Sequence, residues 1–150
     1  MRLERLALIG NCQYSALVED SGTVVWGCLP RFDSDPMFST LLDEQEGGRF
    51  LVGAEDGKPG LMAYEDNTNI LVTTFRGASG AFRVIDFAPR FLQYDRIFHP
   101  TQLFRIVEPL EGTPRVRVLC EPRIGFTKAK PALLTGSNHV RYEGFASQVR

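Results

Sequence analysis

Turn-forming residues recur at short intervals along the whole sequence, and short runs rich in β-branched and aromatic residues lie between them. Glycine and proline supply backbone conformations that other residues resist, so each cluster is expected to end one strand and begin the next. The clusters lie at residues 20–22, 47–48, 56–57, 77–80 and 111–114, and the runs at residues 23–28, 69–75, 81–87, 103–107 and 115–120. Short strands at this spacing predict an all-β sandwich or barrel.

The side-chain pattern within these runs indicates how each strand is covered. Val116, Val118 and Cys120 alternate with Arg115, Arg117 and Leu119, which predicts a half-buried antiparallel strand with one solvated face. Residues 70–75 are largely apolar on both faces, so this strand is expected in the centre of a sheet. The glycine-rich residues 77–80 should then turn the chain into residues 81–87 and form a long hairpin.

One short helix is predicted over residues 35–42. Asp35 can cap its first turn, and Pro36 fits the first helical position because proline lacks the N–H that a helix start leaves unpaired. Apolar residues then recur at helical spacing, at positions 37, 38, 41 and 42.

Composition excludes several classes of protein. The chain is 43% hydrophobic and 23% charged, so it can bury a core and is not a disordered tail. Its formal net charge of -1 gives no electrostatic reason to expect nucleic acid or an anionic membrane as a partner. No apolar stretch approaches the roughly 18 residues of a transmembrane helix.

The cysteines and the first residues indicate the compartment. Cys12, Cys28 and Cys120 are odd in number and form no C-x-x-C pair, so they are interpreted as small buried hydrophobes in a reducing compartment. The apolar run at residues 6–9 is too short for a secretory signal. We therefore expect a soluble, cytoplasmic protein.

Residues that could carry chemistry are sparse, and we expect no catalytic group, no metal and no cofactor in this chain. His99 and His139 are isolated from other potential ligands, so structural roles are favoured over a metal site. The acids at positions 43, 44 and 46 could suggest carboxylate chemistry, but in a glycine-bounded loop they are more typical of a solvated face. Asp86 interrupts an apolar strand, and it is expected either on a solvated face or paired with Arg83 or Arg105.

The densest segment is residues 26–36, where a strand carrying Trp26 enters a proline-bounded loop with Arg31, Phe32 and Asp33. Aromatic rings pack on the apolar faces of sugars, and Arg and Asp bond to hydroxyls, so these four residues could line a sugar site. The structural alternative places Trp26 and Phe32 in the core and pairs Arg31 with Asp33 to fix the loop. Spacing alone favours the structural alternative.

An ordered series of motifs resembles the start of bacterial family 15 glycoside hydrolases, the glucoamylase, glucodextranase and trehalase group. Ile9-Gly10-Asn11, Val25-Trp26 and Pro30-Arg31-Phe32-Asp33-Ser34 resemble the family's I-G-N/D opening, its strand ending in Trp, and its P-R-F-D-S loop. The likeness spans about residues 6 to 125. It continues with Gly47-Gly48, Tyr64, Thr68-Asn69, Val84-Ile85-Asp86-Phe87-Ala88-Pro89 and Arg105-Ile106-Val107.

The resemblance implies an N-terminal antiparallel β-sandwich of the super-sandwich type, followed in such enzymes by an (α/α)6 barrel. The barrel carries two glutamates that hydrolyse α-glucosidic bonds with inversion, so neither would lie in residues 1–150. The family sandwich is usually longer than this chain, and residues 142–150 still alternate like a strand, so the fold is expected to be truncated here. Val25 and Asp35-Pro36 depart from the common pattern, which leaves the substrate open between starch-type oligosaccharides and trehalose.

Three classes of function follow as expectations. In the first, the chain is a non-catalytic domain that packs against the barrel of the same polypeptide, and the loop at residues 30–35 shapes the active-site entrance. The second is a free-standing carbohydrate-binding module, which needs an exposed aromatic platform at Trp26 and Phe32. The third is an unrelated β-sandwich adaptor. If strands are missing, unpaired edges near residues 115–150 should also make the isolated chain self-associate.

Overall fold

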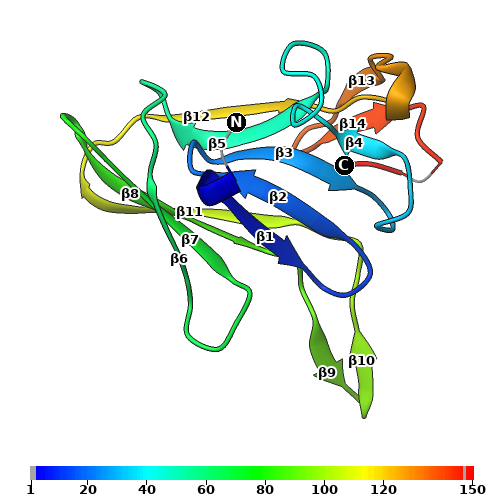
Figure 1. The fold of residues 1–150 in the computed structure, drawn as a ribbon, viewed down its shortest axis with the longest axis horizontal. Helices are drawn as coiled ribbons and strands as arrows, with labels where there is room; N and C mark the ends of the chain where they lie inside the picture. Colours follow the sequence, from blue (N-terminus) through cyan, green and yellow to red (C-terminus); the bar gives the residue numbers. More distant parts are fainter. Residues whose placement is uncertain (1–2, 147) are drawn as a thin grey trace.

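The structure, a computed structural model, describes residues 3–146 and 148–150 and consists mainly of antiparallel strands. Two sheets lie one above the other (Figure 1). The first sheet has the order β1-β2-β3-β5-β12, with β4 paired to β3, and comprises β1 (Leu6–Gly10), β2 (Ser15–Glu19), β3 (Thr23–Cys28), β4 (Pro36–Phe38), β5 (Arg49–Ala54) and β12 (Val116–Glu121). The second has the order β11-β8-β7-β6 and comprises β6 (Leu61–Tyr64), β7 (Leu71–Gly77), β8 (Gly80–Phe87) and β11 (Phe104–Gly112).

Smaller elements extend this sandwich. A hairpin of β9 (Phe91–Gln93) and β10 (Arg96–Phe98) projects away from the two sheets (Figure 1). A second hairpin, β13 (Ala132–Thr135) and β14 (Val140–Glu143), follows β12 near the C-terminus. Within the described residues, the helical content consists of two single 3-10 turns, η1 (Leu3–Arg5) and η2 (Gly125–Thr127). The predicted antiparallel sandwich is confirmed.

The strands predicted from turn spacing are also confirmed. β7 lies between β8 and β6, and the turn between Gly77 and Gly80 joins β7 to β8 as a hairpin. The face prediction for β12 holds only in part. Val118 lies opposite buried Val52 and therefore faces inward, yet 65% of Val118 is exposed. β12 is the edge strand of the first sheet, and Arg117 and Val118 in its middle are exposed, whereas Val116 and Cys120 are half-buried.

The predicted helix over residues 35–42 is wrong. Pro36–Phe38 forms strand β4, and the residues that follow make turns. The backbone N–H groups of this segment bond across the fold instead of along a helix, because Ser39 N–H donates to Gly47 and Leu41 N–H donates to Val25. Met37 and Phe38 join the core, so tertiary packing outweighs the helical spacing.

Two hydrophobic clusters hold the sheets together. The first joins residues of β1 to β4 with Leu71 of β7. In the second, Val52 of the first sheet packs on three residues of the second, Phe75, Phe82 and Val84. The Phe75 and Phe82 rings stack with their centroids 4.9 Å apart. Each cluster therefore contains residues from both sheets.

The free edge of β1 is covered by side chains from the segment around β6. The Tyr64 hydroxyl accepts a bond from Leu8 N–H and donates one to Leu8 C=O, both at 2.8 Å. The Asn69 amide donates to Gly10 C=O. An edge strand whose backbone groups are bonded in this way is a poor template for another chain.

A buried ion pair connects the second sheet to the first. Arg105 of β11 donates to both carboxylate oxygens of Asp86 at 2.8 and 3.0 Å, and to the carbonyls of Phe50 and Gly22, each at 2.7 Å. The Asp86 and Arg105 side chains are only 0% and 3% exposed. Of the alternatives for Asp86, pairing with Arg105 is confirmed. Gly22 has φ +82°, and a Cβ there would lie 2.1 Å from Val52 O, so the position requires glycine.

Candidate functional site at the loop end of the sandwich

Three segments that are far apart in sequence meet at one end of the sandwich. They are the β1–β2 turn at residues 11–14, the loop at residues 30–35, and the arm, which we define as residues 90–99 and which contains β9 and β10. Asn11 fixes the base of the arm because its side-chain amide donates to the carbonyls of Pro89 and Pro100 at 3.2 and 2.9 Å. Asn11 itself is 1% exposed.

Gln13 links the arm to the loop at residues 30–35. Its side-chain amide donates to the Thr101 hydroxyl at 3.0 Å and to Pro30 C=O at 3.4 Å, and its oxygen lies 2.7 Å from a ring nitrogen of His99. Its backbone carbonyl accepts a bond from Phe32 N–H at 3.2 Å. One residue therefore sets the position of the loop relative to the arm.

Tyr14 fixes the other side of the arm's base. Its hydroxyl donates to Gln102 C=O, and the side chain is among the most deeply buried in the domain. Burial raises the pKa of Tyr14 because the phenolate would lose its hydration. The group thus stays a neutral hydrogen-bond donor.

The loop at residues 30–35 presents its central side chains outward. The Arg31 guanidinium donates to both oxygens of Asp33 at 2.8 and 3.0 Å, and Phe32 between them is 66% exposed. Hydrogen bonding by Arg31 lowers the pKa of the Asp33 carboxyl below its ordinary value. The predicted Arg31–Asp33 pair is confirmed, whereas the placement of Phe32 in the core is wrong because the loop projects from the sheet end.

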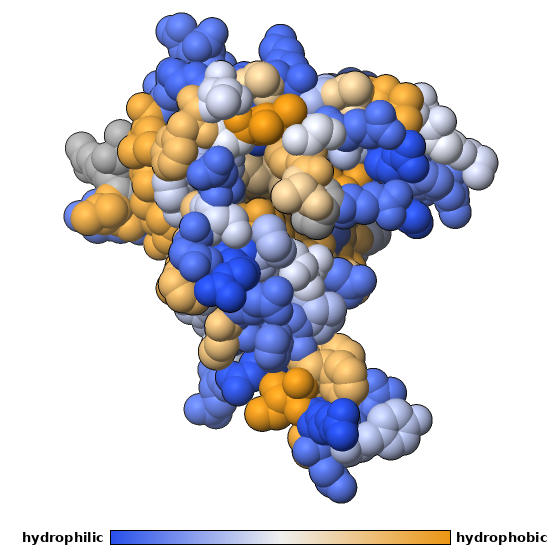
Figure 2. All heavy atoms as spheres, turned by 90° about the vertical axis from the view of Figure 1, so that its right-hand side faces the viewer, coloured by the Kyte–Doolittle hydropathy of each residue, from blue (hydrophilic) through white to orange (hydrophobic). Residues whose placement is uncertain are grey.

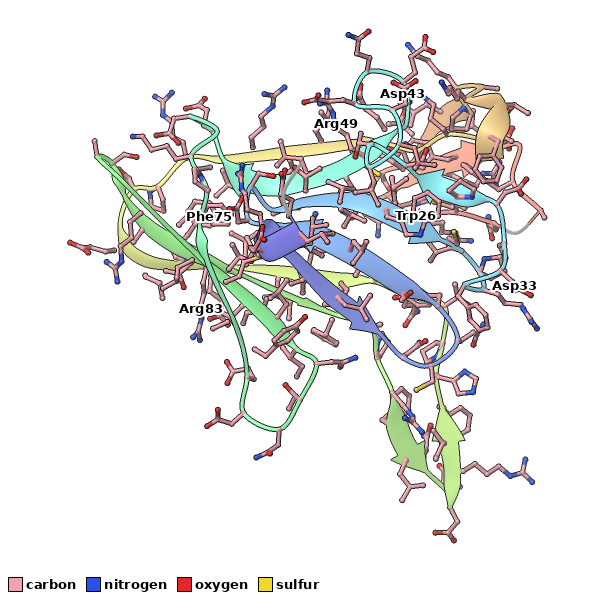
Figure 3. The ribbon with its side chains drawn as sticks, viewed as in Figure 1. Trp26, Asp33, Asp43, Arg49, Phe75 and Arg83 are labelled. Atoms are coloured by element: carbon pink, nitrogen blue, oxygen red, sulfur yellow. The ribbon has the colours of Figure 1, made fainter. Side chains whose placement is uncertain are left out.

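Trp26 is not part of this surface. It lies in β3 opposite Leu17 of β2 and is half-buried on the sheet. Figure 3 shows it apart from Asp33, which lies beyond the end of the sheet. The structure therefore brings together three of the four candidate residues, Arg31, Phe32 and Asp33, and leaves Trp26 aside.

Other residues of the family-like motifs stabilise the sandwich itself. Asp86 and Arg105 form the buried pair, Asn11 fixes the arm, and Tyr64 and Asn69 cover the β1 edge. Within the described ranges, the side-chain hydrogen bonds of Arg31 all go to Asp33. The P-R-F-D-S loop is thus the motif whose central side chains are available to a partner.

The acidic cluster is a solvated, cation-paired loop, as favoured from sequence. Asp43 accepts bonds from the N–H groups of Gln45 and Glu46 and from the Lys128 ammonium. Together these bonds lower the pKa of the Asp43 carboxyl to about 2, and the Lys128 contact contributes most. In residues 3–146 and 148–150, no three His, Cys, Asp or Glu side chains gather as a metal would need.

The three cysteines differ in how far they are buried. All three cysteines are free. The interpretation of every cysteine as buried is confirmed for Cys28, holds only in part for half-buried Cys120, and is wrong for exposed Cys12. Cys12 lies in the β1–β2 turn with φ 72°, where Arg90 of the arm donates to its sulfur at 3.3 Å.

Within the described residues, no helix is long and apolar enough to cross a membrane.

The fold and this surface define an antiparallel β-sandwich domain with a projecting loop and arm at one end. The chain belongs to the family of trehalase-like N-terminal domains, whose model matches residues 1–149.

Similar proteins include trehalases of archaea. The chain is 30% identical over 135 residues to a trehalase of Thermoplasma volcanium. The matched stretch covers 88% of this chain and 21% of that protein. It is 32% identical over 120 residues to a trehalase of Thermoplasma acidophilum, covering 78% of this chain and 20% of that protein. Trehalase 1 of Sulfolobus acidocaldarius is 38% identical over 87 residues, or 58% of this chain and 15% of that protein. The chain thus spans about a fifth of the first two relatives. No solved structure matches it significantly.

Proposed function

We propose that this chain is the non-catalytic N-terminal domain of a cytoplasmic, inverting α-glucosidase of family 15, acting on trehalose. The family match, the names of the relatives and the fifth of their length that it spans support this assignment. The domain packs against the catalytic part of the same polypeptide, for which the motif resemblance implies an (α/α)6 barrel. The free cysteines suit a reducing compartment.

The outward loop at residues 30–35 is the observation that carries the functional proposal. Arg31, Phe32 and Asp33 project from the sandwich, while their backbone is tied to Gln13 and to the Ser34 hydroxyl. A preorganised loop loses little entropy on docking. The loop therefore contacts the catalytic part and shapes the entrance to its active site.

Each of the three side chains suits a distinct contact. Phe32 is an exposed aromatic of the kind that anchors an interface. The Arg31–Asp33 fork offers guanidinium donors and carboxylate acceptors that fit sugar hydroxyls or a polar interface rim.

Alanine substitutions in the polypeptide that contains both domains test the proposal. In that polypeptide Arg31→Ala, Phe32→Ala and Asp33→Ala should raise KM for trehalose or lower kcat. In residues 1–150 alone the same changes should leave the melting temperature nearly constant, because these side chains are exposed there. Arg76→Ala is the matched control, since Arg76 lies in β7 beside the β7–β8 turn and its side chain is 73% exposed. Lower stability with unchanged kinetics would instead assign the loop to the scaffold.

The exposed Phe32 also supports a second candidate, a carbohydrate-binding module. Half-buried Trp26 lies elsewhere on the sheet, so the two rings do not form the platform that this function needs. Titration calorimetry of residues 1–150 with maltooligosaccharides and trehalose distinguishes the candidates. Binding that is lost in Phe32→Ala would favour the module, and no heat of binding would favour the docking domain.

A further inference from the structure

The arm exposes apolar side chains on both of its faces. Every residue from 90 to 99 is exposed. Phe91 pairs with Phe98 across the hairpin, and their rings stack with centroids 5.8 Å apart on one face. Leu92 pairs with Ile97 on the other face, where they are 70% and 55% exposed. Figure 2 shows apolar residues on the arm, away from the body of the domain.

An isolated ribbon of this size does not hold its shape in water. Two strands of three residues each provide few cross-strand pairs, and a lone two-stranded hairpin is marginal at best. Its turn residues, Tyr94 and Asp95, both have positive φ, at 51° and 57°, which is unfavourable for side chains with a Cβ. The base, by contrast, is fixed by Asn11, Gln13 and Tyr14. The sandwich therefore holds the arm's direction but leaves its apolar surface uncovered.

The two-sided pattern specifies the shape of the partner. A ribbon lying on a flat surface buries only one face, and here the other face would keep either the Phe pair or the Leu–Ile pair in water. Only a cleft encloses both. Arg96 lies on the same face as the Phe pair, nearer the turn, so this cleft should be apolar with a carboxylate or carbonyl acceptor deeper inside.

We propose that the arm inserts as a wedge into an apolar cleft of the catalytic part that follows this domain, which rests on the function proposed above. The relatives extend about four-fifths of their length beyond the matched segment, which provides a partner in the same polypeptide. Gln13 holds the arm and the loop at residues 30–35 at the same end of the sandwich. Both features therefore face one partner.

Limited trypsin digestion tests the wedge without relying on activity. Cleavage after Arg96 is compared between residues 1–150 alone and the polypeptide that contains both domains. Arg76, an exposed residue of β7 beside the β7–β8 turn, is the internal reference. The wedge predicts that the longer polypeptide slows cleavage after Arg96, relative to Arg76, by on the order of tenfold or more. Equal relative rates would overturn it. Concentration-dependent protection in residues 1–150 alone would overturn it in favour of a second copy.

A double variant and its control complete the experiment. Leu92→Ser with Ile97→Ser should restore cleavage after Arg96 in the longer polypeptide, because it removes the apolar face opposite the Phe pair. Leu61→Ser, at a residue 77% exposed on β6, should leave the protection unchanged. Protection that survives the double variant would contradict insertion. A trehalose hydrolysis assay on the unsubstituted longer polypeptide tests the proposed function separately. If that polypeptide is active but its arm is not protected, the wedge is refuted and the proposed function is not.

Discussion

Asp86 and Arg105 illustrate how much depends on one residue pair in this domain. Their contact is buried, whereas Arg83 and Glu108 form an ion pair on the same two strands with side chains 39% and 42% exposed. Asp86→Ala should destabilise the fold by about 3–5 kcal/mol, because it leaves a buried guanidinium without its counter-charge. Glu108→Ala should cost about 1 kcal/mol or less. Denaturant unfolding of both variants measures the difference, and equal losses would contradict the role of burial.

Asp43 gives a prediction for the effect of pH. Its folded-state pKa of about 2 lies below the ordinary value of 3.8. At pH values above 3.8 the ionised carboxylate therefore stabilises the folded state. This contribution is lost as the pH falls through about 2. An NMR titration should find the Asp43 midpoint near 2, and Lys128→Ala should raise it. Because Gln45 and Glu46 still donate to the carboxylate, the midpoint in the variant should remain below 3.8. A midpoint unmoved by Lys128→Ala would contradict the contact.

The exposed inward face of β12 leads to a prediction at the scale of elements. β1 is bonded along its edge by Tyr64 and Asn69, whereas β12 keeps Val118 65% exposed on its inward side. The isolated chain should therefore self-associate through β12. Val118→Lys should weaken this association by on the order of tenfold. Sedimentation velocity over a range of concentrations measures it, and a monomer at all concentrations would contradict the prediction.

Elements were predictable where local sequence and tertiary contacts agree. The β7–β8 hairpin has both apolar strands and a glycine-rich turn, and it forms as expected. Asp35 and Pro36 are good helix-start residues, so the local pattern of residues 35–42 predicts a helix. Their backbone instead bonds to β3 and to the turn before β5, contacts that a local pattern does not contain. The sequence does not predict the arm, because Tyr94-Asp95 lacks the glycine that usually marks a two-residue hairpin turn.

The candidate site was predictable in its residues but not in its surroundings. Arg31, Phe32 and Asp33 stood out as a polar and aromatic group between prolines, and all three are exposed. The sequence does not indicate the roles of Gln13 and Tyr14, because their partners lie 88 residues away at Thr101 and Gln102. Only the folded chain brings these segments together.

At the scale of the whole molecule, the domain alone should have no hydrolytic activity. Inverting hydrolysis requires an acid and a base on opposite sides of the bond, with space between them for a water molecule. The acids of residues 43–46 lie in an exposed loop, and Asp86 is committed to Arg105. Residues 1–150 should therefore release no glucose from trehalose, maltose or soluble starch. Turnover that a single carboxylate substitution abolishes would overturn this prediction.

The hydrogen bonds from Asn11 to the base of the arm have a consequence for folding during translation. Its amide bonds to Pro100, which follows 89 residues later in the chain. At about 5–20 residues per second of synthesis, Asn11 leaves the ribosome roughly 4–18 s before its acceptor. During that interval the β1–β2 turn exists without the bond that seats the arm. The end of the sandwich that carries both the loop and the arm is thus completed only after Pro100 has been synthesised, well after Asn11.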